Sequence, residues 1–283
     1  MATRLVSQAT IGGVMRDLSA LSGLPIALDE QGLLAFGPEV VVDEHRERPV
    51  DALTPVALDP EACRGSHAVA YYMDNGVYLR QDGAHLARLP FRYELTLVPP
   101  RRLGREYVKT FGHLHSVEPR SGLTWAEVCE VVTGTAHFFF QTLDPTGPTA
   151  SKAFYVEAKA GQKVIFPPGL DHCTINPGDE PLLFSDVIAL GVTGDYERFR
   201  RTRGAAYLEV AEDGQPHFIA NPTYASVPPL HKLEMGDYPA LDLTAAEPLY
   251  TAFVRTRGQS WSFLTDPGLF WTTFPDLELI KDV

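Results

Sequence analysis

The middle of the chain is a succession of short segments rich in aromatic and β-branched residues. Between residues 68 and 190 they read AVAYYM, GVYLRQ, RYELTLV, REYVKTF, VCEVV, AHFFFQTL, AFYVEA, QKVIF and LLFSDVIAL. Glycine, proline, aspartate and asparagine separate them, as is typical of strands joined by tight turns. Because no helical pattern lies between these segments, the sequence predicts an all-β domain, an antiparallel sandwich or barrel.

The two ends of the chain have a looser pattern. VMRDLSALSG fits a short helix that starts near Val14 and ends at Gly23, GPEVVVDEHRER fits a helix or a strand, DYERFRRTRG fits a helix or a turn, and LTAAEPLYTAFVRT fits a late helix. No repeat or low-complexity linker marks a boundary. We therefore predict a barrel at residues 68–195, with an N-terminal extension (1–67) and a C-terminal extension (196–283) that are helical or irregular and pack on it.

Charge and cysteine content limit the partners and the compartment. The chain has 36 acidic and 24 basic residues, and its net charge of -12 would repel nucleic acid and anionic membranes. Its three cysteines cannot form a full disulfide set and lack zinc-finger spacing, which favours a reducing compartment. No apolar run has the length of a signal-peptide core or a membrane span. We expect a cytoplasmic protein that binds a small molecule, and neither nucleic acid nor a membrane.

Two histidines one residue apart give the first chemical signal. In KTFGHLH, His113 and His115 project to the same face if the segment is extended. The chain has nine histidines, so this pair alone fits a solvated or core pair equally well. Further along, Glu127 begins the segment EVCEVVTG, where it shares a strand face with Cys129 and precedes Gly134.

A second motif supports a metal site. In GQKVIFPPGLDHCTIN, gaps of five, one, two and three residues separate Gly161, Pro167, Gly169, His172 and Asn176. This spacing is the second motif of the cupin superfamily, and the histidine pair with Glu127 and Gly134 resembles the first. Two features depart from that first motif: eleven residues lie between His115 and Glu127 where three or four are usual, and Tyr107 stands in place of a glycine.

The resemblance to cupins implies a jelly-roll barrel, also called a double-stranded β-helix, that holds one divalent metal. The implied ligands are His113, His115, Glu127 and His172. Three imidazoles and a carboxylate, without thiolate, suit Fe(II), Mn(II), Zn(II) or Ni(II) and leave coordination positions for a substrate or water. Fe(II) is the first choice.

The chain resembles most closely the cupin-type glucose-6-phosphate isomerases of archaea and some bacteria. RYELT, GREYVKTFGHLH, AEVCEVVTG and PPGLDHCTINPGDEP follow that family's pattern from about Arg92 to Tyr196. The resemblance implies a homodimeric isomerase of glycolysis and gluconeogenesis that interconverts glucose 6-phosphate and fructose 6-phosphate, or acts on a related sugar. It also implies a set of substrate and phosphate contacts: Thr96, Lys109, Thr110, the backbone of Gly112, Tyr71 or Tyr72, and Tyr196. Taken alone, Thr96 is also an ordinary strand residue.

Isomerisation would move hydrogen between C1 and C2 of the open-chain sugar. Glu127 is the candidate that carries the proton through a cis-enediol, because Glu130 lies on the opposite strand face. A metal-assisted hydride shift is the alternative route. The sequence does not choose between them.

Several positions depart from the family pattern. Cys129, Ile188 and Gly194 stand where that pattern has an aromatic residue, a tyrosine and a histidine. Such replacements remove hydrogen-bond partners from a site that recognises hydroxyls. Two alternatives therefore stay open: a metal-dependent cupin oxygenase or isomerase for another small molecule, for example in secondary metabolism, and a silent sugar-binding cupin. The thiol at 129 could take part in redox chemistry or simply fill space, and His137 is expected to face inward or to be satisfied at the barrel wall, and not to be a metal ligand.

Overall fold

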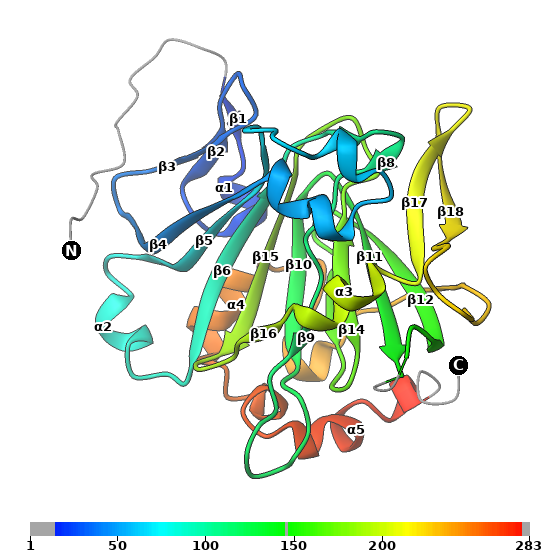
Figure 1. Cartoon of the computed structure of the whole chain (residues 1–283). Helices are drawn as coiled ribbons and strands as arrows, with labels where there is room; N and C mark the ends of the chain where they lie inside the picture. Colours follow the sequence, from blue (N-terminus) through cyan, green and yellow to red (C-terminus); the bar gives the residue numbers. More distant parts are fainter. Residues whose placement is uncertain (1–14, 145–146, 279–283) are drawn as a thin grey trace.

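Two sheets face each other across the core of the molecule, antiparallel except where β19 joins β12 in parallel (Figure 1). The computed structural model describes residues 15–144 and 147–278. The first sheet has the order β13 (Lys163–Phe166), β10 (Glu127–Thr133), β15 (Leu182–Ala189), β6 (Phe91–Val98), β5 (Val69–Leu79) and β4 (Val40–Pro49). The second has the order β14 (Asp171–Ile175), β11 (Thr135–Leu143), β12 (Ala150–Lys159) and β19 (His231–Leu233).

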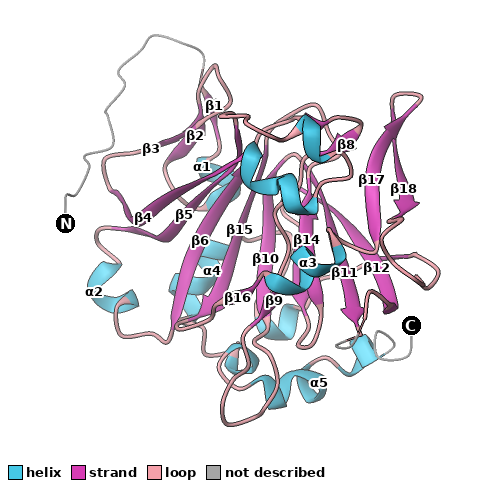
Figure 2. Ribbon diagram, in the orientation of Figure 1, coloured by secondary structure: helices cyan, strands magenta, loops and turns pink. Residues whose placement is uncertain are grey.

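Smaller elements surround these sheets (Figure 2). They are the sheet of β1 (Arg16–Asp17), β2 (Ile26–Leu28) and β3 (Leu34–Phe36), the pair β9 (Leu114–His115) and β16 (Gly194–Asp195), and the sheet of β7 (Arg102–Leu103), β8 (Glu106–Tyr107), β17 (Tyr207–Glu212) and β18 (Gln215–Ala220). The α-helices are α1 (Ser19–Ser22), α2 (Gly83–Leu86), α3 (Glu197–Thr202), α4 (Leu249–Thr256) and α5 (Phe270–Thr273). The 3₁₀ turns are η1 (Val50–Val56), η2 (Pro60–Ala62), η3 (Pro239–Leu241), η4 (Ser262–Leu264), η5 (Pro267–Leu269) and η6 (Pro275–Glu278).

The chain path is that of a jelly roll. After β6 the chain crosses to the second sheet, where residues 109–115 join β14 through bridges from Lys109 to Ile175 and from His113 to His172. It then returns for β10, crosses for β11 and β12, and alternates through β13, β14 and β15. Because this order gives two facing sheets of the jelly-roll type, the predicted all-β barrel is confirmed.

Aromatic side chains fill the space between the two sheets. The segment AHFFFQTL forms β11, and its alternation sends Phe138 and Phe140 inward. Phe138 lies 5.3 Å from Phe166 of β13 and 5.8 Å from Phe184 of β15, measured between ring centroids. Each buried ring contributes roughly 1.5–3 kcal/mol through the hydrophobic effect. Phe166 also packs against His172 at 4.9 Å, so this core supports the residues of the predicted metal site.

The barrel includes more of the chain than the sequence predicted. GPEVVVDEHRER forms strand β4, which pairs along β5, so this part of the N-terminal segment is strand and adds to the barrel's own sheet. From the other end, β19 joins β12 and β17 joins β8. The boundaries at residues 67 and 195 therefore do not coincide with the ends of the sheets. β4 is a strand because its pairing with β5 supplies hydrogen-bond partners for its backbone N–H and C=O groups.

The flanking helices agree more closely with the sequence. The predicted late helix α4 is confirmed, and α3 shows that DYERFRRTRG, which fits a helix or a turn, forms a helix. Helix α1 has only four residues and ends at Gly23; Val14 lies outside the described residues. α4 covers the outer face of the first sheet, where Tyr250 meets Tyr93 at 5.2 Å and Phe253 meets Phe91 at 6.4 Å. Because α4 covers this face, the opposite face of β6 lines the barrel interior.

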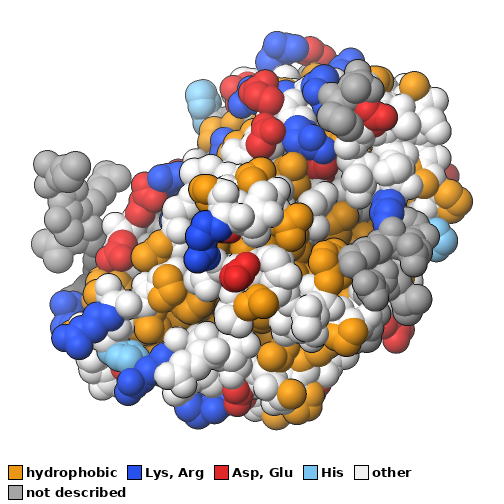
Figure 3. All heavy atoms as spheres, turned by 90° about the horizontal axis from the view of Figure 1, so that it is seen from below, with side chains coloured by type: hydrophobic (Ala, Val, Ile, Leu, Met, Phe, Trp, Pro, Cys, Tyr) orange, Lys and Arg blue, Asp and Glu red, His pale blue; other side chains and the backbone are white. Residues whose placement is uncertain are grey.

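The surface mixes apolar and charged side chains. Figure 3, which shows the molecule from below, has hydrophobic side chains spread among charged and other polar ones. Across residues 15–144 and 147–278, no helix combines the length and the apolar character that a bilayer crossing requires.

A pair of glycine substitutions tests the packing of the strand turn after β10. Gly134 has φ +86°, and a Cβ there would lie 2.8 Å from the carbonyl oxygen of Pro181. Gly122 has a similar φ of +71°, and a Cβ at that position would have no other atom within 4 Å. Gly122→Ala should cost about 1–2 kcal/mol of unfolding free energy from backbone strain alone. Gly134→Ala should cost about 1–3 kcal/mol more, because backbone must move. Urea denaturation of both variants measures this, and equal losses would contradict the packing argument.

Candidate active site

One cavity of about 450 Å³ opens between the two sheets, on the inner side of β6, β10 and β15. The residues from the sequence analysis that line it are Tyr71, Thr96, Thr110, Gly112, His113, His115, Glu127, His172, Ile188, Gly194 and Tyr196. They come from strands far apart in the sequence, which the jelly-roll crossing brings together.

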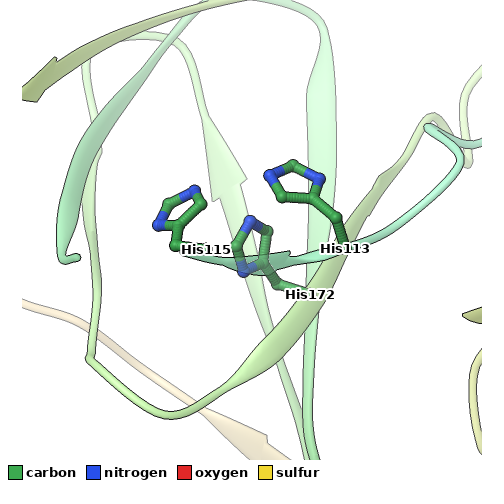
Figure 4. A group of neighbouring side chains, drawn as sticks. All are labelled: His113, His115 and His172. Atoms are coloured by element: carbon green, nitrogen blue, oxygen red, sulfur yellow. The ribbon is translucent and has the colours of Figure 1, made fainter. Parts of the chain in front are cut away.

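Three imidazoles meet at the centre of this cavity (Figure 4). One ligand nitrogen from each of His113, His115 and His172 lies within 4.8 Å of the other two. Two backbone hydrogen bonds set the strands in place: the N–H of His113 donates to the carbonyl of His172 at 3.0 Å, and the N–H of His172 donates back at 2.9 Å. Strand pairing therefore brings the three side chains together.

Backbone carbonyls orient two of the rings. Nδ1 of His115 lies 2.9 Å from the carbonyl oxygen of Trp125, and Nδ1 of His172 lies 3.1 Å from that of Leu170. A carbonyl can only accept, so Nδ1 carries a proton in both rings, and the neutral form of each ring has the lone pair on Nε2. Nε2 of His115 is buried and has no hydrogen-bond partner within residues 15–144 and 147–278, although the carboxylate of Glu127 lies near it. Metal-binding histidines are held in this way, so the residues present fit a divalent metal.

The electrostatics of the rings agree with this role. Burial lowers the pKa of His113 well below its usual value, and the neighbouring His172 and His115 add to the shift. Burial and His115 lower the pKa of His172 in the same direction. Neutral imidazoles are the form that binds a metal ion, so protons would compete little for this site.

Glu127 stands beside the three histidines. Its Oε2 lies 3.1 Å from Nε2 of His115, and its Oε1 accepts a hydrogen bond from Sγ of Cys129 at 2.9 Å. Burial opposes ionisation, but His115 and the Cys129 thiol outweigh it, so the pKa of Glu127 is lowered. Among the described residues, the tight group of ligand atoms comprises the three histidines, and the carboxylate of Glu127 lies beside it, next to His115.

The long connection between His115 and Glu127 does not separate them. Residues 116–126 form a loop between β9 and β10, visible below the barrel in Figure 1. The carboxylate of Glu118 stabilises it by accepting from the N–H groups of Arg120 at 3.1 Å and Ser121 at 2.7 Å. The chain then returns so that Trp125 contacts His115. An insertion of this kind is tolerated because it lies outside the strands.

Most of the expected substrate contacts face the cavity, but Lys109 does not. Tyr71 lines it and Tyr72 does not, so Tyr71 is the relevant residue of the pair. The hydroxyl of Tyr71 accepts a hydrogen bond from the N–H of Phe111 at 3.3 Å. The expected position of Lys109 needs correction: its buried ammonium contacts the carboxylate of Glu106 and donates to the carbonyl of Val56 at 2.8 Å. The side chain points away from the cavity because a buried carboxylate holds it there.

The positions that depart from the family pattern have different surroundings. Ile188 and Gly194 line the cavity, whereas Cys129 is buried behind Glu127. A Cβ at Gly194 would lie 2.9 Å from Cδ2 of His113, so a larger residue there would displace that ring.

Two further titratable residues, His137 of β11 and Glu130 of β10, do not line the cavity, as the sequence predicts for Glu130. Nδ1 of His137 is 2.7 Å from Glu209. Glu130 accepts from Nζ of Lys163 at 2.6 Å and from the N–H of Leu249 at 2.8 Å. Both side chains are therefore engaged on the outer faces of their strands.

Sequence reasoning missed the charged side chains of the cavity wall. Glu94 and Asp186 line it together with Arg46, and Arg48 lies next to its aromatic residues. Glu94 could have been found, because it is two residues before Thr96 and shares its strand face. Arg48 could not, since it belongs to β4, which the sequence placed outside the barrel.

Arg48 sits among three aromatic rings that line the cavity. Its guanidinium carbon lies 5.9 Å from the ring centroid of Tyr71, 5.9 Å from Phe111 and 5.7 Å from Tyr196. Its Nε is buried without a hydrogen-bond partner among the described residues. Cation–π contacts hold this guanidinium beside the rings that line the cavity, and its Nε–H stays available.

Comparison with known proteins agrees with the resemblance drawn from the sequence. The family model described as Glucose-6-phosphate isomerase (GPI) matches residues 47–224. A glucose-6-phosphate isomerase of Pyrococcus abyssi (strain GE5 / Orsay) is 30% identical over 134 residues, which are 47% of this chain and 65% of the relative. One of Thermococcus onnurineus (strain NA1) is 29% identical over 132 residues, 47% of this chain and 64% of the relative. The chain thus spans slightly less than two thirds of these relatives.

Similarity to solved structures is partial. An oxalate oxidase structure has a TM-score of 0.27 at 16% identity and covers 35% of this chain and 41% of its own. An oxalate decarboxylase from Bacillus subtilis has a TM-score of 0.28 at 16% identity and covers 44% of this chain and 27% of its own.

Substitution of Lys109 distinguishes a structural role of its ammonium group from a role in substrate binding. Lys109→Met should cost about 3–5 kcal/mol of unfolding free energy, because Glu106 would be left buried without its cation. The double variant with Glu106→Gln should recover part of this loss. Urea denaturation of both proteins measures the difference. Unchanged stability with weakened binding of a sugar phosphate would contradict the structural role.

Proposed function

We propose a function from one premise: the chain belongs to the glucose-6-phosphate isomerase family. On this basis it is a metal-dependent aldose–ketose isomerase that interconverts glucose 6-phosphate and fructose 6-phosphate, or a closely related sugar phosphate. The observation that carries the proposal is the shared cavity, where three histidines and a carboxylate face several hydroxyl-bearing side chains.

The metal would be held by His113, His115 and His172, with Glu127 as the fourth ligand. The nitrogen and oxygen donors suit Fe(II) first, and also Mn(II), Zn(II) or Ni(II). When bound, such an ion acts as a Lewis acid on the carbonyl and hydroxyl oxygens of the substrate. The lone pairs on Nε2 of His115 and His172 are available because the backbone fixes the opposite nitrogen.

Glu127 would transfer the proton between C1 and C2. As a carboxylate it removes the proton from the carbon beside the carbonyl, and as the acid it returns that proton to the neighbouring carbon. One C–H bond breaks and another forms, while a hydroxyl proton moves to the former carbonyl oxygen. The lowered pKa of Glu127 keeps it ionised before the reaction, and the Cys129 thiol holds one of its oxygens in place.

The phosphate would bind at the end of the cavity lined by Tyr71, Thr96, Thr110 and the backbone of Gly112. Arg48, and not Lys109, would supply the positive charge there. The argument for Arg48 is its position beside Tyr71, its buried Nε without a partner among the described residues, and the engagement of Lys109 with Glu106. Guanidinium groups bind phosphate by charge-assisted hydrogen bonds.

We also propose that the protein is a homodimer and that it is cytoplasmic. Cys63, Cys129 and Cys173 are all buried and free, as expected in a reducing compartment. Burial raises the pKa of Cys63 to about 11 and that of Cys173 to about 12, so these thiols are inert.

Activity with a defined metal tests the isomerase. Protein reconstituted with Fe(II), Mn(II) or Zn(II) should convert fructose 6-phosphate to glucose 6-phosphate. His172→Ala should lose both bound metal and activity, whereas His217→Ala, an exposed histidine, should lose neither. Glu127→Gln should lower kcat by about 10²–10⁴. Reaction in D₂O should label C2 of the product if Glu127 exchanges its proton. Oxygen uptake without isomer formation would contradict the proposal.

A kinetic comparison tests the phosphate contact. Arg48→Gln should raise KM for the sugar phosphate by about tenfold to a hundredfold, because one charged hydrogen bond contributes roughly 1.5–3 kcal/mol. kcat should change little. Arg64→Gln, which removes an exposed arginine paired with Glu61, serves as the control. An unchanged KM in Arg48→Gln would remove this residue from the site.

A further inference from the structure

Two carboxyl groups face each other on the wall of the cavity. Glu94 of β6 and Asp186 of β15 are direct partners in the antiparallel register, and both side chains line the cavity. Partners in this arrangement have Cβ atoms about 4.5–5.5 Å apart. Neither residue belongs to the histidine group or to the proposed phosphate contacts.

Their interactions differ. The carboxylate of Glu94 contacts the guanidinium of Arg92, two residues earlier on the same strand. Asp186 is only 5% exposed, yet within residues 15–144 and 147–278 its carboxyl has no hydrogen-bond or ion-pair partner. A buried polar group without a partner is costly unless something else satisfies it. At the wall of a binding cavity, water does so in the free protein, and a ligand that displaces this water can take its place.

The register places Asp186 between the two ends of the proposed substrate site. Along β15, Ile188 lies opposite Glu127 of the reacting end. Asp186 lies opposite Cys129 on one side and Glu94 on the other. Phe184 lies opposite Thr96, at the proposed phosphate end. Since side chains two residues apart share a strand face, Asp186 faces the middle of a substrate that extends from the histidines to Thr96.

We propose that Asp186, with Glu94 beside it, binds a hydroxyl group on the carbon chain between the reacting end and the phosphate, and so selects a polyhydroxy substrate. This inference rests on the proposed sugar-phosphate isomerase. It gives a role to a carboxyl that has no partner among the described residues. It also returns a hydrogen-bonding group to a cavity wall where Ile188 and Gly194 provide no polar side chain.

A hydroxyl suits the pair better than an ammonium group. Burial, and then the neighbouring Glu94, raises the pKa of Asp186 well above its usual value. A raised pKa favours the neutral carboxyl, which can donate one hydrogen bond and accept others. A hydroxyl offers the same combination. An ammonium group would instead favour two ionised carboxylates, and Arg92 already neutralises Glu94.

Binding of a polyol phosphate tests the inference without turnover. Calorimetry on the metal-loaded protein compares sorbitol 6-phosphate with its 3-, 4- and 5-deoxy analogues. The wild-type protein should bind one of the analogues about tenfold to a hundredfold more weakly. Asp186→Ala should lose this preference, and Asp186→Asn should keep part of it because an amide also donates and accepts. Ser185→Ala, on the other face of the same strand, should keep all of it.

The outcomes separate this inference from the isomerase proposal. The same preference in Asp186→Ala, given an unchanged melting temperature and metal content, would overturn it. So would wild-type protein that binds every analogue equally or binds no polyol phosphate. Tighter binding of a 2-amino analogue, lost in Asp186→Ala, would identify an ammonium site and overturn it as well. Wild-type protein that shows the preference but does not isomerise fructose 6-phosphate would contradict the isomerase and leave hydroxyl selection standing.

Discussion

The backbone bridge between His113 and His172 is the contact on which the rest of the site depends. Two hydrogen bonds of 3.0 and 2.9 Å lock one strand of the second sheet to the segment that carries the histidine pair. His115 follows in β9, which pairs with β16 at Gly194. With both strands fixed, the backbone alone brings the three rings together, and little conformational entropy remains to be lost on metal binding.

Aromatic residues of the core support this arrangement from one side. Phe166 and Phe140 pack against the ring of His172, with centroid distances of 4.9 and 6.3 Å. Burial of this kind favours neutral imidazoles, and neutral imidazoles are metal ligands. The same burial makes unpaired carboxyl groups costly. Glu127 has His115 and Cys129 as partners, whereas Asp186 has none among the described residues, and this difference separates the proposed reacting end from the proposed binding wall.

Motif spacing could predict the centre of the site but not its wall. His113, His115, Glu127 and His172 were found because the spacing of ligands along strands depends on local periodicity. The sequence does not predict where the Lys109 side chain lies, because its partners are Glu106 of β8 and Val56 of the 3₁₀ turn η1. No local pattern shows that this turn packs beside Lys109. Arg48 could not be predicted, because β4 joins the barrel by pairing with β5. The run of three valines at residues 40–42 does not by itself predict this pairing. In the sequence, Asp186 is a single polar residue within an apolar strand. Only the strand register, which places it opposite Glu94, indicates that it belongs to the cavity wall.

The central claim is that one divalent ion binds where the three imidazoles meet. Anomalous diffraction from crystals loaded with a single metal, collected at its absorption edge, tests this most directly. The account predicts one strong peak per chain, about 2.0–2.2 Å from a nitrogen of His113, His115 and His172 and from a carboxylate oxygen of Glu127. A peak elsewhere, or none at full metal loading, would contradict it.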